Sequence, residues 1–156
     1  MSMNDTTLRR QLVNLLRGGE AHGEVADAIT SFPPTMAGSR LSGVPHTPWR
    51  LLEHMRIAQG DILEFCQNPE HVSPEFPGGY WPEDDLPPSA AIWDRAVAVF
   101  CGDLQAMQDL VTNPATELLT PILHGQGQTI LREALLVADH NSFHLGQLSV
   151  IRHGLS

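Results

Sequence analysis

Apolar residues recur at helical spacing in four stretches of the chain, and segments rich in proline and glycine separate these stretches. In each stretch the apolar positions form a stripe at spacings of three and four, which is typical of a helix that buries one face. No alternating run of β-branched residues indicates a strand. The pattern therefore predicts an all-α fold, and four helices of such length predict a four-helix bundle. The expected helices cover residues 5–31, 47–67, 89–111 and 128–153.

Local residues mark where several of these helices begin and end. Thr47 is a good N-cap, and Pro48 follows it at the first helical position, where its missing N–H is harmless. Asn68 and Pro69 end the second helix, and Gly154 is expected to end the last. The glycine pair at residues 18 and 19 predicts a kink within the first helix rather than its end.

Length and composition narrow the function. The chain of 156 residues has no linker-like segment, so we expect one domain over residues 1–156. Its net charge is −9 and every basic residue is an arginine, which excludes lysine-based catalysis and argues against a nucleic-acid partner. We find no apolar run long enough to span a membrane and no secretory pattern at the N-terminus. With only two cysteines, we expect a reduced, cytoplasmic protein without a membrane partner.

Histidine is the residue type that stands out, with eight copies in the chain. His140 and His144 are one turn apart on the apolar face of the last predicted helix, where two imidazoles can reach one metal ion. His54 lies on the apolar stripe of the second predicted helix. Three buried imidazoles are costly unless something shared satisfies them, and a divalent ion does so. The alternative is that they are hydrogen-bonded core or capping histidines.

Two further residues are candidates for a pocket or for outer contacts of such a site. His22 lies on the inward stripe of the first predicted helix, where it either contacts a metal ligand or the substrate, or is a plain core or interface histidine. Gln147 shares the face of His144 and could donate to a substrate. The other four histidines receive no role. Competing metal sites fail on spacing, because no Glu-x-x-His, no His-Glu-x-x-His and no metal-type pair of cysteines occurs.

Two segments carry a resemblance to a known family. The sequence LLEHMRIAQGDIL around His54 and LLVADHNSFHLGQL around His140 and His144 resemble the DinB superfamily of YfiT-like proteins. The similarity extends to PHTPW before the second helix and to HGQGQTILREALL before the last. It implies a four-helix bundle with a mirror variant of the up-and-down topology. It also implies one divalent ion, zinc or nickel, on the three histidines, and a homodimer.

The resemblance leaves the activity open. Members of the family include thiol-dependent S-transferases and proteins described as metal-dependent hydrolases, so a metalloenzyme acting on a small molecule is expected, with a low-molecular-weight thiol as a possible co-substrate. The alternative is a non-catalytic, metal-stabilised stress-response or binding protein. We also expect the aromatic side chains of the loop over residues 68–88 either to cover the mouth of the metal site or to pack against a second copy. These are Phe76, Tyr80 and Trp81.

Overall fold

The computed structural model describes residues 3–155, and these residues form five α-helices, two short 3-10 turns and no β-strand. The all-α prediction is therefore confirmed. In chain order the elements are α1 (Met3–Arg17), α2 (Val25–Thr30), η1 (Pro34–Met36), α3 (Pro48–Gln67), η2 (Gly78–Tyr80), α4 (Ala90–Thr112) and α5 (Ile130–Gly154). No helix among the described residues is both long and apolar enough to cross a membrane.

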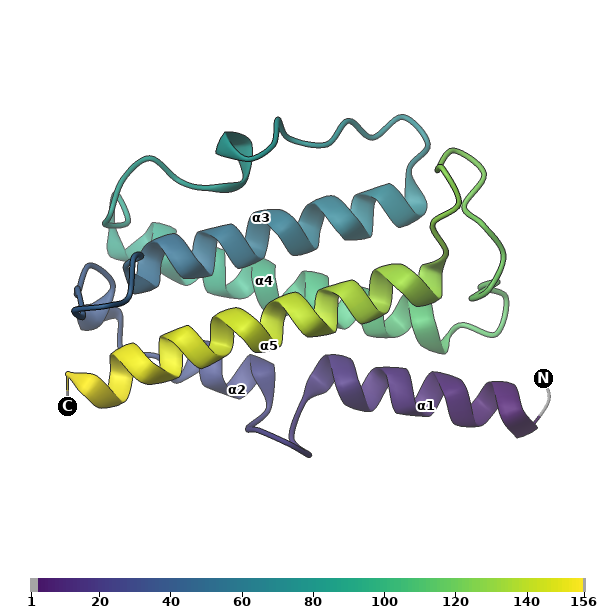
Figure 1. Ribbon diagram of the computed structural model, residues 1–156, viewed down its shortest axis with the longest axis horizontal. Coiled ribbons are helices and arrows are strands. Elements are labelled where there is room, and N and C mark those ends of the chain that lie inside the picture. The colour runs from purple at the N-terminus through teal and green to yellow at the C-terminus, as the bar shows by residue number, and fades with distance from the viewer. Residues whose placement is uncertain (1–2, 156) are drawn as a thin grey trace.

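The long helices lie side by side (Figure 1). Helix α3 packs against α4 and α5, and α1 packs against the same two helices from the other side. The fully buried side chains come from all of these helices and from α2, so one core runs through the molecule. The largest of them are Phe100, Leu16, Ile29, Leu51, Leu52, Met55, Leu104 and Met107.

The helix starts follow from local capping. The hydroxyl oxygens of Thr47, Ser89 and Thr129 each accept a hydrogen bond from the backbone N–H three residues ahead. This satisfies one of the otherwise unpaired N–H groups of a first helical turn. The predicted bounds of α3, α4 and α5 are accordingly within two residues of the observed ones. Gly154 is the last residue of α5 rather than the residue that follows it.

The first predicted helix was wrong in its middle. Residues 18–24 form a break between α1 and α2, closed by an isolated bridge between Gly18 and Glu24. Gly18 and Gly19 both have positive φ, a left-handed conformation that ends a helix and that glycine adopts without a steric cost. His22 consequently leaves the inward stripe and lies exposed in the break. A kink would only bend the helix, whereas two successive left-handed residues end α1.

The segment between α3 and α4 runs back along the outside of α3 (Figure 1). Its path is held by side chains at several points. Thr47 donates to the carbonyl of Asp85 at 2.8 Å, and Arg50 donates to the carbonyl of Glu83 at 3.1 Å. Arg40 pairs with the carboxylate of Asp85. The loop thereby lies over the face of α3 from which His54 projects.

Candidate metal centre

Three histidines from two helices meet between α3 and α5. His54, His140 and His144 each offer a ring nitrogen, and these three atoms lie within 4.8 Å of one another. The Nε2 atoms of His54 and His140 are 2.9 Å apart. The ring centroids of His140 and His144 are 4.5 Å apart, as expected for residues one helical turn apart. The structure thus brings together the three residues that the sequence singled out, and they are close enough to hold one metal ion.

In two of the rings, those of His54 and His144, Nδ1 points away from the cluster and makes a hydrogen bond. These bonds fix which nitrogen of each ring is unprotonated. His54 donates from Nδ1 to the backbone carbonyl of Tyr80 at 2.8 Å, since a carbonyl can only accept. His144 donates from Nδ1 to Oε1 of Gln147 at 2.7 Å. In each neutral ring the lone pair is then on Nε2. Metal-binding histidines use this arrangement, in which a second partner orients the ring and selects the tautomer.

Burial keeps the three rings neutral. Desolvation lowers the pKa of His54, of His144 and of His140, and for His140 it lowers the pKa to about 4, with a smaller contribution from the two neighbouring rings. Neutral imidazole is the form that ligates a metal. The lone pair on Nε2 of His54 faces Nε2 of His140 at 2.9 Å, and a shared cation can bind both nitrogens. Two nitrogens on one zinc ion lie about 3.4 Å apart, so the two rings need to separate by only about half an ångström to share an ion. The residues present therefore fit a divalent ion.

Trp81 covers one side of the cluster. Its ring stacks on His54 with centroids 3.7 Å apart and planes 3° from parallel, and the ring of His46 also stacks on the indole at 4.1 Å. The loop aromatics were expected either to cover the mouth of the site or to pack against a second copy, and for Trp81 the first alternative is confirmed. Phe76 is instead exposed. The stacked rings exclude water from one side of His54.

The sequence assigned no role to Asp61 and His71, yet both hold the loop that orients His54. Asp61 on α3 accepts a hydrogen bond from the hydroxyl of Tyr80 at 2.7 Å, and His71 contacts its other carboxylate oxygen at 2.7 Å. Tyr80 is the residue whose carbonyl accepts from His54. The only signal for this contact in the sequence is that Asp61 and His71 are ten residues apart on either side of a helix end. Many pairs that do not touch have the same spacing, so it could not have identified the contact.

Replacing Asp61 by alanine should therefore weaken metal binding without removing a ligand. Both side chains that fasten the loop lose their acceptor, so the carbonyl of Tyr80 is no longer held against His54. Loss of an outer contact of this kind costs roughly tenfold in metal affinity. The measurement is a competition titration against a chromophoric chelator. Asp94→Ala, an exposed aspartate on α4, is the matched control and should bind as wild type. Equal affinities in the two variants would show that the loop does not orient His54.

The remaining candidates are placed differently. Gln147 contacts His144, as an outer partner does, and it lines a hollow of about 270 Å³ together with Phe143 and Val44. His22 lies on the other side of α5, where its Nε2 is 3.2 Å from the hydroxyl oxygen of Ser142, so it is not part of this cluster.

Beneath the histidines, Gln59 joins Asn141 to the carbonyl of Phe100 through two buried hydrogen bonds of 2.8 Å. The sequence analysis missed this amide pair, which ties α3, α4 and α5 together.

Comparison of the chain with family models, with curated proteins and with solved structures finds no match. The resemblance to the DinB superfamily consequently rests on the histidine segments themselves. The geometry around His54, His140 and His144 is therefore the main structural indication of function.

Proposed function

We propose that the protein is a DinB-like metalloenzyme in which His54, His140 and His144 hold one divalent ion, zinc or nickel. The observation that carries the proposal is the convergence of three ring nitrogens within 4.8 Å. In two of these rings, His54 and His144, Nδ1 already donates a hydrogen bond to a protein oxygen. In this proposal the fold is the four-helix bundle of that family in its mirror-variant topology. The broken pair α1 and α2 takes the place of its first helix.

The donor set favours an S-transferase over a hydrolase. A divalent ion on three neutral imidazoles supplies a Lewis acid that lowers the pKa of a bound thiol or water towards neutrality. Among the described residues, no carboxylate belongs to the cluster to serve a water nucleophile as a general base. A thiol needs less help of this kind, because it is far more acidic than water.

The thiol has to come from a separate small molecule. Burial raises the pKa of Cys66 to about 12, and it also raises the pKa of Cys101. Neither side chain is a thiolate near neutral pH, which is the form that reacts. Neither belongs to the histidine cluster. This supports a low-molecular-weight thiol as co-substrate and a small electrophile as its acceptor.

Metal analysis of the purified protein followed by a thiol-transfer assay tests the proposal. We expect about one equivalent of zinc or nickel per chain, and metal-dependent conjugation of a low-molecular-weight thiol to a chromogenic electrophile. His140→Ala should abolish both, and His124→Ala, at the far end of α3 beside Phe65, should change neither. Metal without turnover on any thiol or ester would favour the non-catalytic, metal-stabilised role. A metal-free protein that cannot be loaded would contradict the proposal.

We also propose a two-fold homodimer, which the family resemblance implies. Tyr80 and Trp81 contact residues of their own chain, so the exposed apolar side chains of α5 are the better candidates for an interface. Phe143 and Val150 are two turns apart on one face and are both more than half exposed. Sedimentation should give a dimer for wild type and for Phe76→Ser, and a monomer for Phe143→Ser with Val150→Ser. A wild-type monomer at micromolar concentration would contradict the dimer.

A further inference from the structure

A cavity of about 470 Å³ lies between α2 and α5, away from the histidine cluster. Its volume is in the range of pockets that hold small molecules. The three histidines lie between α3 and α5, whereas the cavity opens on the side of α5 that faces α2. The break between α1 and α2 contributes His22 and Gly23 to its wall. The cavity therefore depends on the feature of the fold that the sequence pattern did not predict.

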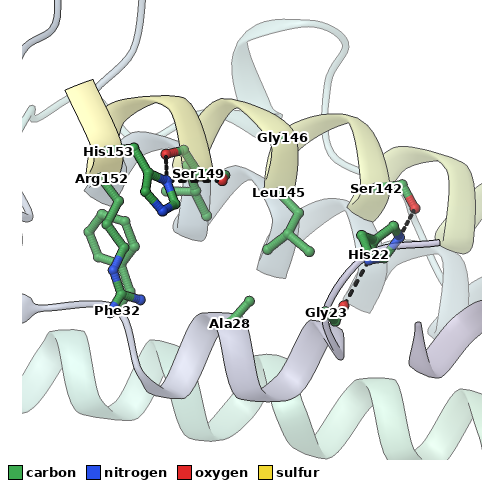
Figure 2. A pocket seen from close by; sticks show the side chains of 11 residues that line it. His22, Gly23, Ala28, Phe32, Ser142, Leu145, Gly146, Ser149, Arg152 and His153 are labelled. Atoms are coloured by element: carbon green, nitrogen blue, oxygen red, sulfur yellow. Dashed lines mark hydrogen bonds between the residues drawn. The ribbon is translucent and has the colours of Figure 1, made fainter. Parts of the chain in front are cut away.

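The walls are apolar in the middle and polar at the two ends (Figure 2). Leu145 from α5 and Ala28 from α2 face each other across the centre. Phe32 and Leu148 are buried lining residues, so the floor is part of the molecular core. Such a shape suits an elongated apolar body whose two ends carry polar groups.

One end of the cavity is cationic. Arg152 extends from α5 towards α2 beside Phe32 (Figure 2), and its Nη1 donates to the hydroxyl oxygen of Ser31 at 3.3 Å. His153 lies at the same end. A guanidinium pairs with carboxylate, sulfonate and phosphate groups through parallel N–H donors. The hydrogen bond to Ser31 holds the head of Arg152 at the rim.

The charge of the lining differs from the charge of the chain. The whole protein has 18 acidic residues and a net charge of −9, yet none of the 11 lining residues, all in the described part of the chain, carries a carboxylate. The net negative charge of so acidic a protein repels an anion, and the described lining residues of this cavity add nothing to that repulsion. Charge and shape together select a ligand with an anionic head and an apolar body.

The other end offers hydrogen bonds rather than a nucleophile. Both ring nitrogens of His22 face oxygen atoms, Nδ1 the carbonyl of Gly23 at 2.8 Å and Nε2 the hydroxyl of Ser142 at 3.2 Å. The hydroxyl of Ser142 donates its single proton to the carbonyl of Ala138 at 2.8 Å. A serine whose proton is engaged by a helical carbonyl is not activated by the histidine. His22 and Ser142 therefore give this end of the cavity a polar wall, and neither acts as a nucleophile.

We propose that this cavity is a binding site for a small anionic amphipathic molecule, with its acidic group at Arg152 and its apolar body between Ala28 and Leu145. The site is separate from the histidine cluster and does not depend on the proposed metal. It gives a role to His22, which the sequence pattern singled out but the metal centre does not use. The occupant is a carboxylate, sulfonate or phosphate attached to an aromatic or alkyl body.

A pair of fluorescent dyes tests the proposal. 8-Anilinonaphthalene-1-sulfonate carries an anionic group on an aromatic body, and N-phenyl-1-naphthylamine has nearly the same body without the charge. We expect saturable binding of both dyes by the full-length protein, with or without chelator, and with the sulfonate bound more tightly. Added salt should weaken only the sulfonate, because salt screens the contribution of Arg152.

Two substitutions with matched controls locate the dyes. Arg152→Gln should weaken the sulfonate by about tenfold and change the uncharged dye by less than about twofold. Arg10→Gln, an exposed arginine on α1, makes the same change in net charge and should affect neither dye. Ala28→Phe fills the cavity and should abolish binding of both, whereas Ala91→Phe, exposed on α4, should leave both unchanged.

Circular dichroism and the metal content show whether Ala28→Phe retains its fold. If it does not, Ser149→Phe fills the same cavity from the exposed wall and takes its place. Loss of both dyes in the folded filling variant, with the charge-selective loss in Arg152→Gln, supports the proposal. Binding that survives in the filled variant, equal effects of Arg152→Gln on the two dyes, or no saturable binding by wild type would each overturn it.

Discussion

A chelator is expected to lower the melting temperature of the metal-loaded wild-type protein by roughly 10 °C. An ion that binds only the folded state stabilises it by about 4 kcal/mol when its free concentration is a thousandfold above the dissociation constant. Each kcal/mol shifts the melting temperature of a chain this size by about 2–4 °C. Without the ion, the Nε2 atoms of His54 and His140 keep only their contact with each other at 2.9 Å. Thermal unfolding followed by circular dichroism, with and without chelator, measures the difference.

His144→Ala provides the test of the site itself. It removes one of the three nitrogens, so it should lower the melting temperature and abolish most of the chelator effect. His153→Ala is the matched control, since it changes an exposed histidine on the same helix and should retain the full chelator effect. A melting curve that does not respond to chelator, on protein shown to contain metal, would contradict ligation by these histidines.

The histidines on α5 could be found from sequence because a helix sets their separation. His140 and His144 are one turn apart in any α-helix, and the apolar residues around them place that turn in the core. The start of α3 was equally accessible, because Thr47 and Pro48 act within one turn. His54 was placed through its position on an apolar stripe. Each of these signals is local, which is why it survives without knowledge of the tertiary structure.

The features that sequence analysis missed depend on contacts between residues that are far apart along the chain. The carbonyl of Tyr80 orients His54 across 26 positions, and a carbonyl leaves no trace in a sequence pattern. Stacking of Trp81 on His54 required the path of the whole loop. A glycine pair is compatible both with a bent helix and with the end of one. The outcome at Gly18 and Gly19 is the end of a helix, and the separate helix α2 that follows packs against α4 and α5.

Arg9 is the clearest example of such a long-range contact. The sequence analysis gave Arg9 no role, yet its side chain is buried and joins α1 to the end of α4. Its guanidinium donates at 2.8 Å to three backbone carbonyls and pairs with the carboxylate of Asp5 at 3.0 Å. The carbonyls belong to Val111, Asn113 and Thr116. A cation at the C-terminal end of α4 also complements the helix dipole.

Arg9→Met is therefore expected to lower the free energy of unfolding by about 3 kcal/mol, because buried carbonyls lose charged donors while the apolar stem is kept. The melting temperature should fall by roughly 10 °C. Urea unfolding in the presence of chelator measures the effect without any contribution from the metal. Arg10→Met, the exposed neighbour on the same helix, should stay within about 0.5 kcal/mol of wild type. If the two variants unfold at the same urea concentration, Arg9 does not fasten α1 to α4, and the core alone sets their packing.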